Sequence, residues 1–187
     1  MKTIRFKSSA EFRRWLEINH AKSDGIWLRF YKKSSGEKTI SRAKALDEAL
    51  CFGWIDGQAN PMDDQSWIQK FTPRRAKSGW SKLNTQHIER LTKAGAMTPA
   101  GIKAVDAAKA DGRWKAAYDS PRNARPPEDF LKELNKNRKA KAFFKTLNKA
   151  NIYSIVYRLQ TAKKPETREK RMQLILAMMD QGKAFHP

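Results

Sequence analysis

The stretch Gly25-Ile26-Trp27-Leu28-Arg29-Phe30-Tyr31-Lys32-Lys33 decides the fold class of the N-terminal part of the chain. The apolar side chains of Ile26, Leu28 and Phe30 alternate with those at positions 27, 29 and 31. A period of two residues is typical of a β-strand with one buried face. The sequence therefore predicts a strand here, between segments that favour helices.

Outward from this strand, the flanking segments predict a small mixed unit. Residues 3–6 favour a first strand, and a helix capped by Ser8 or Ser9 follows it. Ser41 caps a second helix, which Gly53 ends. Thr39-Ile40 could start a return strand, and residues 53–58 and 66–72 favour two more strands joined by a turn-rich segment, residues 59–64. Residues 1–75 are thus expected to form an α+β unit of about four strands and two helices.

The remainder of the chain, residues 76–187, has helical periodicity. Ser81 and the pair Thr98-Pro99 mark two helix starts, and Pro127 and Pro165 mark two more. Apolar residues recur at i, i+3 and i+4 in the last three helical segments. Six of them are expected in one helical core: Phe143, Phe144, Ile155, Leu159, Ile175 and Met179. The sequence predicts an α+β fold in which the N-terminal unit packs on this helical bundle, forming one compact structural unit.

Composition limits the class of protein. The 187 residues include 39 Lys and Arg against 19 Asp and Glu, a formal net charge of +20, and 40% are hydrophobic, enough for a folded core. No apolar run reaches the 18 residues of a membrane helix, and residues 1–6 lead into polar sequence without a signal-peptide core. We expect a cytoplasmic protein without a membrane span. The sequence predicts no oligomeric state.

The positive charge gathers in two windows without any carboxylate. The first lies between Asp64 and Glu89 and holds five basic residues. The second lies between Glu133 and Glu166 and holds nine: Lys136, Arg138, Lys139, Lys141, Lys145, Lys149, Arg158, Lys163 and Lys164. A positive field of this size steers anionic partners towards the protein, nucleic acid among them. The alternative is a solvated surface that only keeps the protein soluble.

The residue types that carry covalent or metal chemistry are few. Cys51 is the only cysteine; its place at a helix C-terminus between apolar neighbours predicts a buried, inert thiol. The three histidines are far apart in sequence, and His186 is expected to be mobile as the penultimate residue. Asp63-Asp64 fits a turn better than a metal site. No Gly-rich phosphate loop is present either. From this short inventory of thiol, histidine and acid residues we predict no catalytic residue, no metal and no cofactor.

The segment from Phe71 to Asn84 has the residues of an anion site. It places two arginines and a lysine before an expected helix start, with hydroxyl and amide side chains and one tryptophan among them. Arginine binds phosphate or carboxylate in a bidentate manner, and tryptophan can stack on a flat ring. The candidate ligand-binding residues are Arg74, Arg75, Lys77, Ser78, Trp80, Ser81, Asn84, Trp54, Asp56, Arg113 and Trp114. The alternative is that Trp80 fills a domain junction, Ser81 only caps a helix and the arginines are solvated or paired with Asp56 or Asp63.

Several blocks of this sequence resemble the YdeI/OmpD-associated family, also called the bacteriocin-protection (OmdA-like) family. The blocks include Phe52–Gly57, Phe71–Asn84, Met97–Gly101, Gly112–Asp119, Phe143–Leu147 and Ala162–Arg171, so the resemblance spans nearly the whole chain. It implies a shared architecture, no known reaction and no catalytic residue. The family name implies a role in envelope or bacteriocin stress.

These observations lead to three hypotheses. The first is a non-catalytic protein that binds a phosphate-rich or otherwise anionic ligand, most plausibly nucleic acid, through the segments around Asp56 and Arg74 and the basic helices of residues 136–164. The second is a small-molecule enzyme or ligand-binding domain with a pocket where the two parts of the chain meet. There Asp56 would be the base or an orienting acid, Arg74 or Arg75 the anion clamp and Trp80 a stacking wall. The third is a protein-interaction role in stress resistance.

Overall fold

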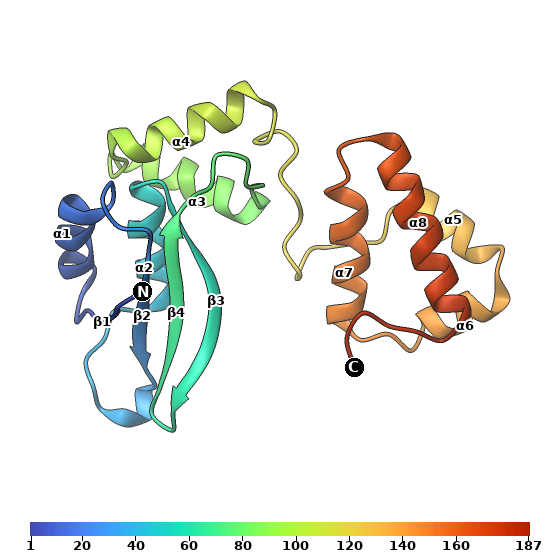
Figure 1. The fold of residues 1–187 in the computed structure, drawn as a ribbon, viewed down its shortest axis with the longest axis horizontal. Coiled ribbons are helices and arrows are strands. Elements are labelled where there is room, and N and C mark those ends of the chain that lie inside the picture. Colours follow the sequence, from blue (N-terminus) through green and yellow to red (C-terminus); the bar gives the residue numbers. More distant parts are fainter. The chain divides into compact units, whose positions relative to one another are not determined.

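The alternating stretch forms strand β2 (Ile26–Tyr31) of a four-stranded sheet (Figure 1). The computed structural model describes every residue, Met1–Pro187. The other strands are β1 (Thr3–Arg5), β3 (Trp54–Asp63) and β4 (Ser66–Pro73), and the order across the sheet is β1-β2-β4-β3. β1 runs parallel to β2, whereas β4 pairs antiparallel with both β2 and β3. Together with eight helices this confirms the predicted α+β fold.

One face of the sheet carries the core of its unit. Ile26, Leu28 and Phe30 are buried on this face, together with Phe71 of β4. Helix α1 (Ser9–Asn19) covers it, and Phe12 of α1 packs edge-on against Phe71 with ring centroids 5.8 Å apart. Helix α2 (Arg42–Cys51) adds five buried side chains. The alternation in β2 thus has the predicted cause, one buried and one partly exposed face.

Helix starts follow the capping residues expected from the sequence. The hydroxyl groups of Ser8 and Ser41 accept hydrogen bonds from the backbone N–H groups of Glu11 and Lys44. Thr98 caps α4 (Pro99–Ala110) in the same way, and α3 (Lys82–Lys93) precedes it. Each cap satisfies an N–H group that has no partner within its helix.

Two local predictions in the first part of the chain are wrong. Residues 59–63 belong to β3, so the β3–β4 turn contains only Asp64 and Gln65. Asp63 closes this tight turn, since its carboxylate accepts from the Gln65 N–H at 3.0 Å and the Ser66 hydroxyl at 2.7 Å. Thr39-Ile40 starts no strand: the Ile40 N–H donates a single bond to the Phe6 carbonyl.

The chain forms two compact units, each with its own core. The sheet unit comprises residues 1–78 and 84–115, and the helical unit comprises residues 79–83 and 116–187. The helical unit contains α5 (Glu128–Asn135), α6 (Arg138–Phe144), α7 (Lys149–Gln160) and α8 (Pro165–Asp180). No helix in either unit has both the length and the apolar composition to cross a membrane.

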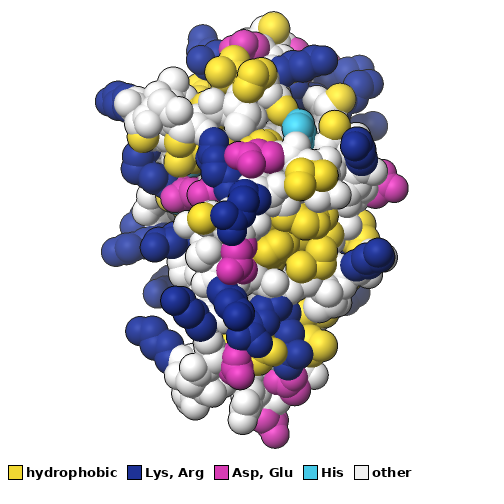
Figure 2. Space-filling model, turned by 90° about the vertical axis from the view of Figure 1, so that its left-hand side faces the viewer, with side chains coloured by type: hydrophobic (Ala, Val, Ile, Leu, Met, Phe, Trp, Pro, Cys, Tyr) yellow, Lys and Arg dark blue, Asp and Glu magenta, His cyan; other side chains and the backbone are white.

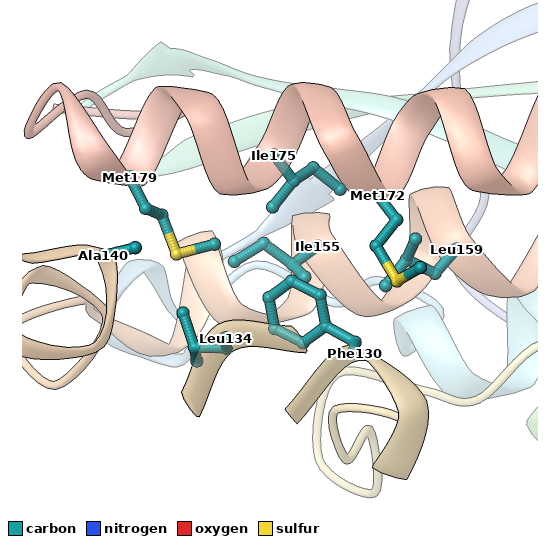
Figure 3. Packing of buried hydrophobic residues seen from close by; sticks show 8 residues of the cluster. All are labelled: Phe130, Leu134, Ala140, Ile155, Leu159, Met172, Ile175 and Met179. Atoms are coloured by element: carbon teal, nitrogen blue, oxygen red, sulfur yellow. The ribbon is translucent and has the colours of Figure 1, made fainter. Parts of the chain in front are cut away.

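Side chains from α5 to α8 meet in the core of the helical unit (Figure 3). Ile155, Leu159, Ile175 and Met179 are buried there as predicted. Phe143 and Phe144 are only partly buried and pack against this cluster, whereas Phe130 of α5 is completely buried in it. The largest side chain of the core therefore comes from a helix for which the sequence analysis named no core residue.

The last residues of the chain are held against α7. The side chain of the buried Asn151 accepts from the backbone N–H groups of Phe185 and His186 at 2.9 and 3.0 Å. The His186 ring lies 2.8 Å from the Ser154 hydroxyl, and the Arg158 guanidinium lies 4.3 Å from the Phe185 ring centroid. Three residues of α7 thus contact this segment, which the sequence analysis did not predict for His186.

Candidate anion-binding site

The end of β4 positions the two central arginines of the sequence-predicted site. Pro73 is the last residue of β4, and the Arg74 N–H donates to the Gly53 carbonyl at 3.0 Å. The chain then turns at residues 75–78, where the backbone N–H and the hydroxyl of Ser78 both donate to the Arg75 carbonyl. Arg74 is half-buried and Arg75 is exposed. Strand pairing and this turn therefore hold the backbone of both arginines.

A cleft of about 490 Å³ lies beside this turn in the sheet unit. It contains three basic side chains, those of Lys70, Arg74 and Arg75, and one carboxylate, that of Asp24. Its other lining residues are Met1, Ile55, Thr72, Pro73 and Ser78. The structure thus joins three of the candidate residues, Arg74, Arg75 and Ser78, in one hollow. Sequence reasoning noted Lys70 only as part of a basic window and did not select Asp24.

Two candidates on β3 belong to the opposite face of the sheet. Ile55 pairs with Thr72 and lines the cleft, so its neighbours Trp54 and Asp56 point the other way. Trp54 is buried, and its indole N–H donates to the His20 carbonyl at 3.1 Å. The Asp56 carboxylate accepts from Arg42 at 2.7 Å and from Gln69 at 2.9 Å. Both residues stabilise the sheet unit and do not line the cleft.

Arg113 holds the turn beside the cleft from outside it. Its guanidinium donates to the Ser78 carbonyl at 3.0 Å and pairs with the Asp111 carboxylate at 2.6 Å. Only 11% of its side chain is exposed. Arg113 therefore fixes the turn at residues 75–78, whereas the cleft contains neither Arg113 nor Lys77, which is exposed. Trp114 lies under the Lys109 ammonium group, 5.5 Å from its ring.

The remaining candidates take part in backbone pairing and helix formation. Trp80 is buried, and its carbonyl accepts from the Tyr118 N–H within the helical unit. Ser81 forms a parallel bridge with Tyr118. Asn84 is half-buried in the first turn of α3. None of the three is among the residues that line the cleft.

The charge of the whole molecule does not by itself single out a site. Figure 2 shows Lys and Arg side chains spread over one face, with Asp and Glu side chains between them. Salt bridges pair many of these groups, including Arg29 with Asp63 and Arg42 with Asp56. A ligand site for an anion therefore requires a cleft in which basic groups outnumber acids.

Cys51 is the one thiol that a covalent mechanism could use, and its surroundings oppose ionisation. It is buried at the C-terminal end of α2. Burial, followed by the charge of Glu48, raises the pKa of the Cys51 thiol to about 11. The predicted burial of Cys51 is confirmed, and the thiol is protonated at neutral pH.

We expect a thiol reagent at pH 7.5 to label native Cys51 at least about 300-fold more slowly than the chain unfolded in urea. A free thiol has a pKa of about 8.5, so a pKa near 11 lowers the thiolate fraction by about that factor, and burial slows access further. Stopped-flow labelling with and without urea measures the ratio. Equal rates in the two conditions would contradict the buried position.

Two family matches divide the chain. Residues 4–104 match a domain of unknown function, DUF8412. Residues 123–182 match the family described as Bacteriocin-protection, YdeI or OmpD-Associated. The resemblance to the second family is therefore confirmed for most of the helical unit. The blocks at residues 52–57, 71–84 and 97–101 lie in the first match, and the block at residues 112–119 lies in neither. No curated protein and no solved structure matches the chain significantly.

Proposed function

We propose, on the premise that the chain belongs to the DUF8412 family and that its residues 123–182 match the YdeI/OmpD-associated, bacteriocin-protection family, that it is a non-catalytic binding protein for a phosphate-rich ligand, nucleic acid in particular. The description of neither family includes a reaction. The proposal keeps the cytoplasmic location that the sequence predicts.

The cleft at the end of β4 is the observation that carries this proposal. Lys70, Arg74 and Arg75 line it against the single carboxylate of Asp24, so the hollow has a surplus of positive charge. Arginine presents a planar fork of donors that matches a phosphate group, and lysine adds a compact charge. The ring of Pro73 restricts the backbone ahead of both arginines, and Arg113 fixes the turn behind them. A preorganised site loses less entropy when a ligand binds.

Basic side chains of the helical unit provide further, sequence-independent contacts with a polyanion. Most bases between Glu133 and Glu166 are exposed. Only Lys136 among them forms an ion pair, with Glu133 at 2.8 Å. Exposed lysine and arginine bind phosphates and release condensed counterions, which makes such binding depend on salt.

A labelled DNA duplex tests the proposal. If the protein neutralises about six phosphates, log Kd plotted against log salt has a slope of about 5 in magnitude, so affinity falls roughly a thousandfold between 50 and 200 mM salt. Fluorescence anisotropy at several salt concentrations measures the slope. The absence of binding at 20 mM salt would overturn the proposal and leave the positive charge a role in solubility only.

Variants of the cleft show whether it takes part. Arg74→Gln with Arg75→Gln should lower the magnitude of the slope by about 2, because each lost phosphate contact accounts for about 0.9. Lys32→Gln with Lys33→Gln removes the same charge from an exposed turn of the same unit and should change the slope little. Arg74→Lys with Arg75→Lys keeps the charge and removes the forks, so a loss in this variant shows bidentate contacts. Equal effects of the two glutamine variants would exclude the cleft as the site.

A further inference from the structure

A second cleft lies within the helical unit. The sequence analysis named two of its residues, Lys149 in the second basic window and Phe144 as a core residue, but did not predict a cleft there. Its volume is about 480 Å³, which lies in the range of small-molecule sites. Three parts of the chain form its walls: residues 121–126, which precede α5, helix α6 and helix α7. The lining residues are Pro121, Arg122, Ala124, Arg125, Pro126, Phe144, Lys149, Ile152 and Tyr153.

The charge inside this cleft is positive only. Arg122, Arg125 and Lys149 line it, no carboxylate does, and none of the three forms a salt bridge. Two acids that flank the segment in sequence are engaged elsewhere in the same unit. Asp119 pairs with Lys82 at 2.9 Å, and Asp129 accepts two hydrogen bonds from Arg168. Three exposed cations therefore line one cleft without a counterion among its lining residues, which favours an anionic group there.

The backbone that carries the two arginines is stiff. Pro121 and Pro126 bracket them, and each proline ring restricts its own φ. The N–H groups of Asn123 and Ala124 both donate to the Ser120 carbonyl, at 3.0 and 2.9 Å, and the Ala124 side chain is buried. Arg125 donates to the Ala124 carbonyl at 3.2 Å. The backbone that carries both arginines is therefore an ordered turn, from which the two exposed side chains extend.

The opposite wall is apolar and aromatic. Phe144 is held by an edge-on contact with Phe130 of the core, with ring centroids 6.0 Å apart. Tyr153 packs against Tyr157 at 5.9 Å. Both rings are half-buried and line the cleft together with Ile152. A ligand that fits this wall has a flat ring beside its anionic group.

We propose that this cleft binds a nucleotide, with the phosphate at Arg122, Arg125 and Lys149 and the base against Tyr153 and Phe144. Cationic forks suit the phosphate, and aromatic side chains stack on any base because every base has a π-face. The nucleotide is either free or the 5′-phosphorylated end of a strand, since both present the same chemistry. This site lies in the helical unit and stands independently of the cleft at Arg74.

Isothermal titration of the full-length protein at low salt tests the site. The probes are AMP, inorganic phosphate, and a short oligothymidylate with and without a 5′-phosphate. We expect AMP, the phosphorylated oligonucleotide or both to bind with a Kd below about 1 mM, an affinity that three charge-assisted contacts can supply. Binding of AMP identifies a free nucleotide, and binding of the phosphorylated strand alone identifies a strand end. Failure of both to bind overturns the proposal.

Matched variants locate the binding. Arg122→Gln with Arg125→Gln should weaken binding at least about tenfold. Lys170→Gln with Lys183→Gln removes two exposed charges from the same unit, away from the cleft and from the bases between Glu133 and Glu166, and should change it less than about twofold. Equal losses in the two variants would show that only net charge matters and would overturn the site.

The aromatic wall needs its own variant. Tyr153→Leu should weaken AMP about tenfold, as expected from the loss of one stacked base, and leave the affinity for inorganic phosphate unchanged. An equal effect on both probes would overturn the role of the ring. Arg74→Gln with Arg75→Gln should leave AMP binding intact. The proposals for the two clefts are therefore tested separately. Circular dichroism checks that each variant is folded.

Discussion

Replacing Gly101 with alanine should lower the free energy of unfolding by about 3 kcal/mol or more, at the upper end of overpacking effects. A Cβ atom at Gly101 would lie 2.2 Å from the Cys51 carbonyl oxygen and 2.8 Å from the Met97 methyl carbon. The Cys51 oxygen cannot move away freely, because it accepts from the N–H and the hydroxyl of Thr98 at 3.1 and 2.7 Å. Urea denaturation followed by circular dichroism measures the change.

Gly95→Ala is the matched control in the same unit. Gly95 has a φ of +64°, and a Cβ atom there would meet nothing within 4 Å. Its substitution therefore costs only the left-handed backbone strain, about 1–2 kcal/mol. A Gly101→Ala variant no less stable than Gly95→Ala would show that α4 can move away from the end of α2 at little cost.

Local signals account for most of the correct sequence predictions. Ser8, Ser41 and Thr98 cap helices as expected, because a capping side chain acts on N–H groups two or three residues away. Gly95 has the left-handed backbone that ends a helix. Helix caps and helix-ending glycines depend only on residues close by in the chain. The positions and order of the helices could therefore be predicted from the sequence.

Pairing between distant segments accounts for what was missed. The end of β3 is polar and turn-like in sequence, yet residues 59–63 pair with β4 through two irregularities of register. The same register places Ile55 on the cleft face and sends Trp54 and Asp56 to the other. The sequence analysis assigned Asp56 and Arg74 to one site. Which side chains share a face of the sheet is decided by the register of strand pairing. Arg42, which pairs with Asp56, comes from a helix with no sequence signal for this contact.

Short helices weaken the periodicity signal for the core. Helix α5 has eight residues and only two buried side chains, those of Phe130 and Leu134 at i and i+4, while Leu131 is partly buried against the cluster. Two positions are too few to establish a helical period. The longer pattern that includes Phe143 and Phe144 is easier to detect, but these rings lie at the margin of the cluster. Periodicity identifies the inward face of a helix and does not rank how deeply its members are buried.

Phe130→Ala should accordingly be the most destabilising substitution in the helical unit, lowering the free energy of unfolding by about 3–5 kcal/mol. The Phe130 side chain is fully buried and packs among Leu134, Ile155 and Met172 (Figure 3). Its removal loses the transfer free energy of the ring and leaves a cavity between α5 and its neighbours. The midpoint of urea denaturation, followed by circular dichroism, measures the loss.

Phe143→Ala is the matched control, with the same change of side chain in the same unit. Phe143 is only partly buried, so less apolar surface returns to solvent and water can fill part of the space. We expect the free energy of unfolding to fall by about half as much as in Phe130→Ala. Because Phe130 also supports the ring of Phe144, its loss should weaken AMP binding in the cleft of the helical unit, whereas Phe143→Ala should not. Equal destabilisation by the two substitutions would mean that depth of burial does not set their cost, and that α5 packs more loosely than its buried Phe130 indicates.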